Sequence, residues 1–204
     1  MADEQGEVSE KARKIMKTAE RLFAAGRFGE VTLDDICHEA RVGKGTIYRY
    51  FEDKEDLYYQ VIIHGFEELV ADIRDVGREE QDPAAGLRKV AKHTVQFFSE
   101  RRSLFCLMHS EALRGSERKG ELWKKWHQRY HDIADVFAGF IKHGVEQGVY
   151  ECEFDPSAAA LLLNSMLRGG QRHTDEMPRG DDWPLAVVEL FERGLRVRRE
   201  AEGD

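Results

Sequence analysis

Apolar residues recur with the period of an α-helix along nearly the whole chain, and this pattern limits the fold more than any other feature. On the first predicted helix, over about residues 11–25, they follow the spacing i, i+4, i+7, i+8: Ile15, Ala19, Leu22 and Phe23. Alternation of the kind found in strands is scarce, and the four prolines fall near proposed helix starts or in loops. The sequence therefore predicts an all-α protein.

The helix starts are predicted from capping residues. Thr32 is followed three residues later by Asp35, which is close to a capping box, and Asp53 is a suitable cap for a long fourth helix. After the first helix, we expect helices at about residues 33–40, 44–50, 54–76, 84–100, 103–114, 118–147, 156–171 and 184–199. Three short helices thus precede five or six longer ones.

Composition places the chain among ordinary soluble proteins. It has 204 residues, of which 41% are hydrophobic and 34% charged, and no apolar run approaches the ~20 residues of a membrane span. Residues 1–10 lack the basic and apolar regions of a signal peptide, so we expect them to form a disordered acidic tail. Cys37, Cys106 and Cys152 are widely spaced without a CxxC motif, which favours reduced thiols in a cytoplasmic protein.

The net charge of −8 is unevenly distributed along the chain. Residues 11–54 carry 10 Lys and Arg against 7 Asp and Glu, whereas residues 55–204 carry 21 against 28. A small basic module therefore precedes a larger acidic body. Such asymmetry allows a local surface for phosphate while the body is repelled by DNA.

Residues 43–57, GKGTIYRYFEDKEDL, begin with a Gly-Lys-Gly-Thr sequence that resembles a phosphate-binding loop. The phosphate could belong to a nucleotide or to a DNA backbone. A nucleotide-binding P-loop needs an apolar strand before it and a first glycine that is missing here. As a helix, the stretch instead places Ile47 and Phe51 on one face and Gly45 and Arg49 on the other. Two short helices joined by a tight turn indicate a helix-turn-helix, whose second helix enters the major groove.

The exposed face of this second helix suits DNA. Arg49 can form paired hydrogen bonds with guanine, and Thr46 can contact a base edge. Gly45 costs helix stability, about 1 kcal/mol relative to Ala, but permits close approach of the backbone to the groove. Phosphate contacts are expected from four further residues, Lys44, Tyr48, Tyr50 and Lys54.

Residues 11–57 resemble the DNA-binding domain of the TetR family of transcriptional regulators. The resemblance rests on AxxLFAxG in the first helix, TLDDI in the second, and VGKGTIYRYFxDKEDL. It implies a helix-turn-helix domain over residues 11–56 and an effector-binding and dimerisation domain over 57–204. It further implies that Thr32 contacts a phosphate, and that the chain binds double-stranded operator DNA as a homodimer, without cofactor or membrane.

Several positions keep an alternative interpretation. Many family members have Ser where Gly43 stands and His where Tyr50 stands, so a hydroxyl contact at position 43 is absent here. Tyr48 and Tyr50 could be packing residues, and Thr32 could be only a helix cap. Lys54 could pair with a neighbouring aspartate on a solvated surface, either Asp53 or Asp56.

The acidic body offers candidates for the other two implied sites. Apolar helices over about 156–171 and 184–199 predict a dimer interface, with intrachain core as the alternative; its candidates are Leu162, Met166, Val188, Phe191 and Leu195. The effector pocket is expected among aromatic-rich segments, although an aromatic stripe is also typical of core. Its candidates are Phe98, Phe105, Met108, His109, Trp123, Trp126, His127 and Tyr130.

The sequence contains two pairs of residues with the spacing of metal ligands on a helix. His127 and His131 stand at i, i+4, and Cys106 and His109 at i, i+3, but neither pair has an identifiable third ligand. We therefore expect no metal site. No nucleophile motif is present either, so we do not expect an enzyme. The function predicted is a repressor relieved by a small-molecule effector. The alternatives are an activator, a ligand-independent regulator, a metal sensor, and a helical ligand-binding protein without DNA affinity.

Overall fold

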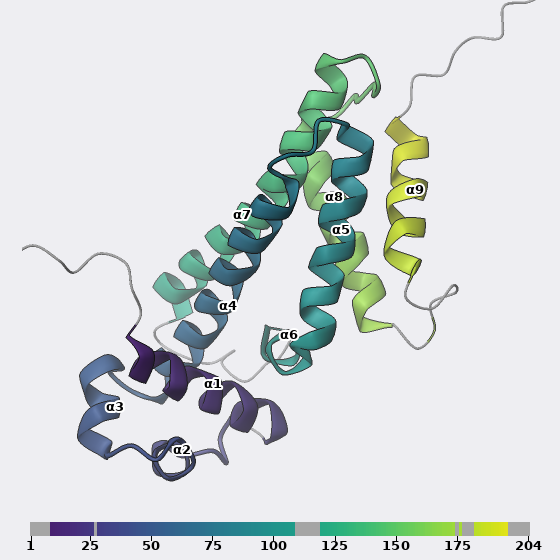
Figure 1. The fold of residues 1–204 in the computed structure, drawn as a ribbon. Coiled ribbons are helices and arrows are strands. Elements are labelled where there is room, and N and C mark those ends of the chain that lie inside the picture. The colour runs from purple at the N-terminus through teal and green to yellow at the C-terminus, as the bar shows by residue number, and fades with distance from the viewer. Residues whose placement is uncertain (1–8, 27, 109–118, 174–175, 177–181, 196–204) are drawn as a thin grey trace, which may run out of the picture. The chain divides into compact units, whose positions relative to one another are not determined.

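The computed structural model of the chain describes residues 9–26, 28–108, 119–173, 176 and 182–195, without the side chains of residues 119–123 and 126. These residues form nine α-helices and no strand (Figure 1), which confirms the predicted all-α fold. The helices are α1 (Glu10–Ala25), α2 (Leu33–Ala40), α3 (Lys44–Tyr50), α4 (Lys54–Gly77), α5 (Pro83–Glu100), α6 (Arg102–Met108), α7 (Lys119–Glu146), α8 (Pro156–Arg172) and α9 (Trp183–Leu195). None of the described helices is both long and apolar enough to cross a membrane.

Local capping chemistry sets several of these bounds. Thr32 and Asp35 form a complete capping box at the start of α2, in which each side chain accepts a hydrogen bond from the other residue's backbone. Asp53 Oδ1 accepts from the backbone N–H of Asp56 at 2.8 Å and so caps α4, as predicted. Wherever both ends fall on described residues, predicted and observed bounds agree to a single residue. The helix bounds predicted at residues 114, 118 and 199 lie outside the described residues.

The chain divides into two compact units. The first consists of Met1–Gly65 and Arg101–His127, and the second of Phe66–Glu100 and Gln128–Asp204. Helices α4 and α7 each continue from one unit into the other. The first unit therefore combines the three N-terminal helices with α6, which comes much later in the sequence.

The core of the first unit is built by the apolar faces of α1, α2 and α3. Ile15, Ile36 and Ile47, one from each helix, are fully buried. An aromatic cluster closes the end of α1, where the ring of Phe23 lies 5.5 Å from Phe28 and 5.3 Å from Tyr58, between centroids. The three short helices thus share one core, as the predicted helix-turn-helix requires.

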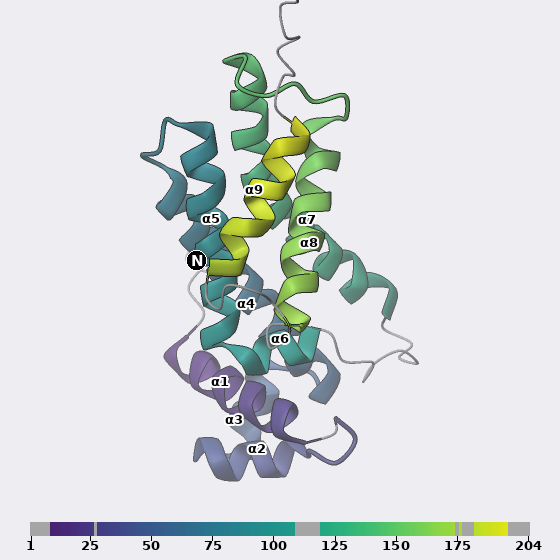
Figure 2. The same cartoon turned by 90° about the vertical axis from the view of Figure 1, so that its right-hand side faces the viewer.

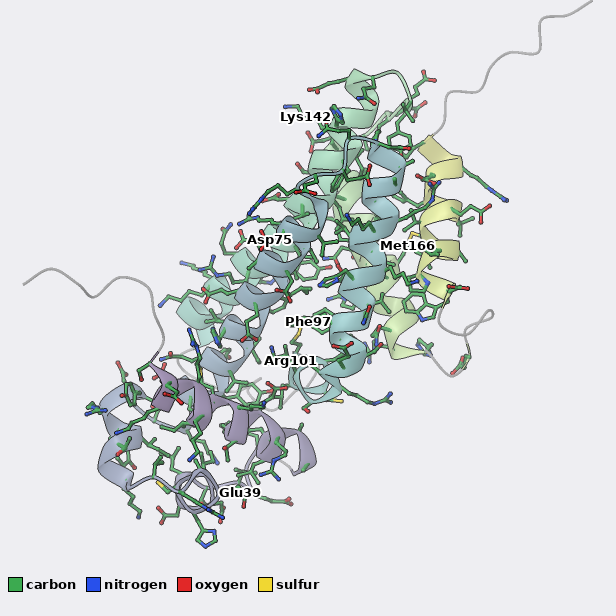
Figure 3. All side chains as sticks on the ribbon, viewed as in Figure 1. Glu39, Asp75, Phe97, Arg101, Lys142 and Met166 are labelled. Atoms are coloured by element: carbon green, nitrogen blue, oxygen red, sulfur yellow. The ribbon has the colours of Figure 1, made fainter. Side chains whose placement is uncertain are left out.

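Helix α6 is fastened to this core by polar and apolar contacts. Arg101, labelled in Figure 3, forms an ion pair with Glu20 of α1, and Tyr58 Oη donates to the carbonyl of Leu107 at 2.8 Å. Leu104 packs so closely on Gly65 of α4 that a Cβ added there would lie 2.4 Å from its Cδ2 atom. These contacts hold α6 against both α1 and the first half of α4.

The second unit is a bundle in which α5 is central. Leu87 and Val90 of α5 and Phe137 of α7 are fully buried. The ring of Phe140 on α7 occupies the space beside Gly86, where an added Cβ would lie 2.1 Å from a ring carbon. Figure 2 shows α9 lying against both α5 and α8, so that α5 contacts helices on several sides.

A buried polar network fixes α9 in this bundle. The carboxylate of Glu192, 1% exposed, accepts from the guanidinium of Arg88 at 2.5 Å and from Tyr150 Oη at 2.8 Å. Burial, together with this bond to the Glu192 carboxylate, raises the pKa of Tyr150 well above its usual value. Side chains from α5, α9 and the segment before α8 thereby meet at one acid.

Candidate DNA-binding surface

The turn between α2 and α3 sets the direction of α3. Arg41 ends α2 with φ 54° and ψ 49°, a left-handed conformation that side chains other than glycine seldom adopt. Gly43 then takes the N-cap position of α3 and offers no side-chain cap. This short turn between the two helices has the length and geometry of a helix-turn-helix.

Helix α3 has one buried face and one exposed face. Ile47 is fully buried and Phe51, directly after the helix, is 2% exposed, as the helical spacing predicted. Tyr48 is 59% exposed, and Lys44, Gly45 and Arg49 are exposed as well. The packing alternative for Tyr48 is therefore wrong, because its phenol stands in solvent.

The exposed cations of α3 have acidic or aromatic partners within the free chain. Lys44 Nζ lies 2.7 Å from Asp34 Oδ1 of α2, and this hydrogen bond raises the pKa of Lys44. The guanidinium of Arg49 donates to Tyr50 Oη at 2.6 Å and lies 4.8 Å from the centre of that ring. Both cations stay at the surface, where such partners are readily exchanged for phosphate or base oxygens.

Tyr50 connects α3 to the start of α1. The pKa of Tyr50 is lowered by two hydrogen bonds to its phenol oxygen. The bond from Ser9 has the larger effect and the bond from Arg49 the next, and the positive charge of Lys11 lowers the pKa further. Because these bonds are made to the oxygen, the phenol O–H remains able to donate to a phosphate. Ser9 and Lys11 therefore adjoin the candidate surface, although nothing in the sequence around them indicates this contact.

Lys54 has a structural role that its sequence neighbours do not reveal. Its ammonium donates to the carbonyls of Phe28 and Val31, both at 2.8 Å, and lies 4.4 Å from the centre of the Phe28 ring. These bonds tie the start of α4 to the loop between α1 and α2. Its predicted phosphate contact stays a prediction.

Two further positions bear on the surface. Gly45 has no atom within 4 Å of the place that a Cβ would occupy, so the free chain leaves this site open. Thr32 is an exposed helix cap, bonded to Asp35 through both its hydroxyl and its backbone N–H. Thr32 is at the surface, and its predicted phosphate contact stays a prediction.

The effector-pocket candidates fall in both units. Phe98 and Tyr130 belong to the second unit, whereas Phe105, Met108 and His127 belong to the first, and all five are partly buried. The remaining candidates lie outside the described residues or side chains: His109, Trp123 and Trp126. The predicted pocket therefore stays a prediction.

The dimer-interface candidates divide into inward and outward groups. Val188 and Leu195 are 0% and 6% exposed, so they belong to the core of the chain itself. Leu162 is 54% exposed on α8, and Met166 and Phe191 are partly exposed. Leu190 of α9, 64% exposed, was not among the candidates but belongs with the outward group.

Within the described part of the chain, no group of three or more His, Cys, Asp or Glu side chains is placed to hold a metal ion. All three cysteines are free thiols. Burial raises the pKa of the Cys37 thiol, which keeps it protonated in the core of the first unit.

The N-terminal part of the chain matches the family model described as bacterial regulatory proteins, tetR family, over residues 15–61. Among its sequence relatives, the chain is 27% identical to the uncharacterized HTH-type transcriptional regulator YuxN of Bacillus subtilis, covering 95% of this chain and 70% of YuxN. It is 22% identical to the HTH-type transcriptional repressor BepR of Brucella suis, covering 80% and 79% of the two chains.

Solved structures share the fold over nearly the whole chain. The fatty acid degradation regulator FadR from Bacillus halodurans superposes with a TM-score of 0.80 at 22% identity, covering 95% of this chain and all of that one. FadR from Bacillus subtilis, solved in complex with stearoyl-CoA, gives 0.77 at 19% identity, covering 89% and 98%. At these identities the likeness shows the fold.

Proposed function

Since the chain belongs to the TetR family of bacterial regulatory proteins, a family of helix-turn-helix transcriptional regulators, we propose that it represses transcription as a homodimer and leaves its operator when a small molecule binds the second unit. The observation that carries this proposal is the two-faced α3. Ile47 and Phe51 hold the helix from beneath while Tyr48, Arg49 and Lys44 stand in solvent. An exposed tyrosine between cations buries little surface in the free fold and is suited to contact the phosphates of a duplex.

In the proposed complex, α3 lies in the major groove. Arg49 exchanges the Tyr50 oxygen for guanine O6 and N7, and Thr46 contacts a neighbouring base edge. Lys44 and both tyrosines bind phosphate oxygens and set the register. Lys11 and Ser9 extend this phosphate-binding surface at the start of α1, because both adjoin Tyr50.

The proposed dimer uses the outward apolar side chains of α8 and α9. Leu162 and Leu190 are each more than half exposed, and the partly exposed Met166, labelled in Figure 3, and Phe191 accompany them. Helices α8 and α9 contact each other, and exposed apolar side chains on two contacting helices favour an interaction site. An interface that uses the same side chains of both chains suits a twofold-symmetric pair.

Release of DNA requires that the effector bind one conformation of the dimer more tightly than the other. Helix α4 runs without a break from the first unit into the second, so a displacement of its second half is carried to its first half, which directly follows α3. FadR of Bacillus subtilis, which shares the fold, was solved with stearoyl-CoA. Acyl-CoA thioesters are therefore among the first compounds to test.

The test is a footprint on DNA from around the gene, at several salt concentrations. We expect protection of a palindromic site overlapping a promoter, and loss of protection on addition of the effector. Arg49→Ala should cost about 1–3 kcal/mol at the cognate site and remove sequence preference. A footprint upstream of the promoter would instead indicate an activator, and the absence of any salt-dependent DNA binding would exclude the proposal.

A further inference from the structure

Asn164 is a buried polar residue whose side-chain NH₂ group has no hydrogen-bond acceptor among the described residues. It lies on α8 and is 5% exposed, and its Nδ2 atom has no partner in the described part of the chain. On its own helix it adjoins buried apolar residues, Ala160 and Leu167 among them. A buried donor without an acceptor destabilises the free fold, so its presence in an apolar region points to an acceptor from another molecule.

Arg168 stands one turn further along α8, on the same face as Asn164. Its guanidinium lies 5.1 Å from the centre of the Tyr130 ring of α7. The ring is oriented by its own hydroxyl, which lies 3.3 Å from Ser165 Oγ. Among the described residues, no carboxylate forms an ion pair with Arg168, in contrast to Arg88 and Arg129 of the same unit.

The two groups lie on the strip of α8 between α5 and α7. On one side of this strip, Ser165 and Arg168 contact Tyr130 of α7. On the other, Gln171 donates to Ser99 Oγ of α5 at 3.2 Å. Helical geometry places Asn164 between these two contacts, so this strip of α8 carries an amide donor and a cation that has no carboxylate partner among the described residues.

We propose that Asn164 and Arg168 form the polar end of the effector site, and that the effector is an organic carboxylate with an apolar body. The inference rests on the proposed function, since it assigns the chemistry of that effector. The guanidinium takes the carboxylate in a charge-assisted hydrogen bond, and the Asn164 amide donates to the same group. The apolar side chains around Asn164 contact the rest of the ligand.

The test uses pairs of compounds that differ only in charge. Binding of decanoate and decanamide, and of 4-phenylbutyrate and 4-phenylbutyramide, is measured on the full-length chain by calorimetry, with decanoyl-CoA as a thioester arm. We expect at least one carboxylate to bind about tenfold or more tightly than its amide and than the thioester. Arg168→Gln should remove this preference, whereas Arg172→Gln, an exposed arginine at the end of the same helix, should keep it.

A second variant separates recognition from folding. Asn164→Leu removes the unpaired donor at similar volume, so its thermal midpoint should equal or exceed that of the unaltered protein. Carboxylate affinity should nevertheless fall about tenfold. A residue needed only for structure would show the reverse, a lower midpoint with unchanged affinity.

Two outcomes overturn the inference: amides or the thioester binding as tightly as both carboxylates, or unchanged carboxylate binding by Arg168→Gln. Operator binding is measured on the same preparations. If the unaltered protein binds its operator but shows no carboxylate preference, this inference fails while DNA recognition stands. If it binds no DNA at all, the proposed function fails instead.

Discussion

The guanidinium of Arg101, directly before α6, lies 2.5 Å from the carboxylate of Glu20 in the middle of α1. The Glu20 side chain is only 11% exposed, so this ion pair is largely withdrawn from water. Arg101→Gln should lower the free energy of unfolding by about 2 kcal/mol, because it leaves the buried carboxylate without its cation. Urea denaturation measures the change.

The neighbouring exposed residue provides the control for this pair. Arg102→Gln alters the same charge one residue later, and its effect should stay within about 0.5 kcal/mol. The double variant Glu20→Leu/Arg101→Met should recover most of the loss, since it removes both charges together. Equal effects of the two single variants would show that the ion pair does not stabilise the first unit.

Gly45→Ala should have opposite effects on folding and on DNA binding. An added methyl group meets no atom within 4 Å in the free chain, and Ala is favoured over Gly in a helix by about 1 kcal/mol. The variant should therefore melt at a higher temperature and bind the operator more weakly. Gly139→Ala on α7, equally open, should gain stability without loss of DNA affinity. Unchanged operator binding by Gly45→Ala would refute the proposed close approach of the backbone.

Substitution of Lys54 and of Lys44 should have different effects on the free energy of unfolding. Lys54→Met deletes two bonds to loop carbonyls and should destabilise the chain by about 2 kcal/mol. Lys44→Met loses only an exposed ion pair and should change stability by less than about 0.5 kcal/mol. It should instead lower the slope of log affinity against log salt by about one. The prediction fails if Lys44→Met is the more destabilising variant.

Tyr150 should make the folded state sensitive to alkali. In the folded chain the pKa of Tyr150 is raised above its ordinary value of about 10, so folding favours the neutral phenol. Its contribution to stability is complete below pH 10 and declines as pH rises from there toward the folded pKa. Tyr150→Phe should cost about 1–2 kcal/mol at neutral pH through the lost bond to Glu192, but lose less stability above pH 10. Parallel stability curves for the two proteins would contradict this.

The outward group on α8 and α9 should determine the oligomeric state. Leu162→Glu or Leu190→Glu places a charge in the proposed interface and should convert the dimer to a monomer, as seen by light scattering. Val145→Glu changes another exposed apolar residue, 39% exposed on α7, and should leave the dimer intact. A dimer that survives both leucine substitutions must be formed by another surface.

Helix positions were predictable because their signals are local. The capping box at Thr32, the Asp53 cap and the spacing of Ile47 and Phe51 each depend on residues within one turn of one another. The same holds for the two faces of α3. These parts of the candidate site follow from capping residues and helical periodicity, before any tertiary contact is known.

Contacts between distant residues were not predictable in this way. Lys54 is separated by 26 residues from Phe28, and no local pattern joins them. Periodicity likewise identified α9 as apolar but could not tell which of its sides meets α5. Val188 therefore proved buried within the chain while Leu190, two residues later, stands outside. The side-chain NH₂ group of Asn164, which has no acceptor among the described residues, was not predictable either, because its hydrogen bonding depends on what surrounds it in the fold.

On α3, the residue that packs into the core is separate from the residues that face solvent. Ile47 contributes the buried contact, whereas Lys44, Tyr48 and Arg49 bury little and anchor nothing beneath them. Substitutions at those three positions can therefore accumulate with little loss of folding free energy. A duplicated gene could thus acquire a new target sequence through a few surface changes, while its product still folds and keeps its original effector.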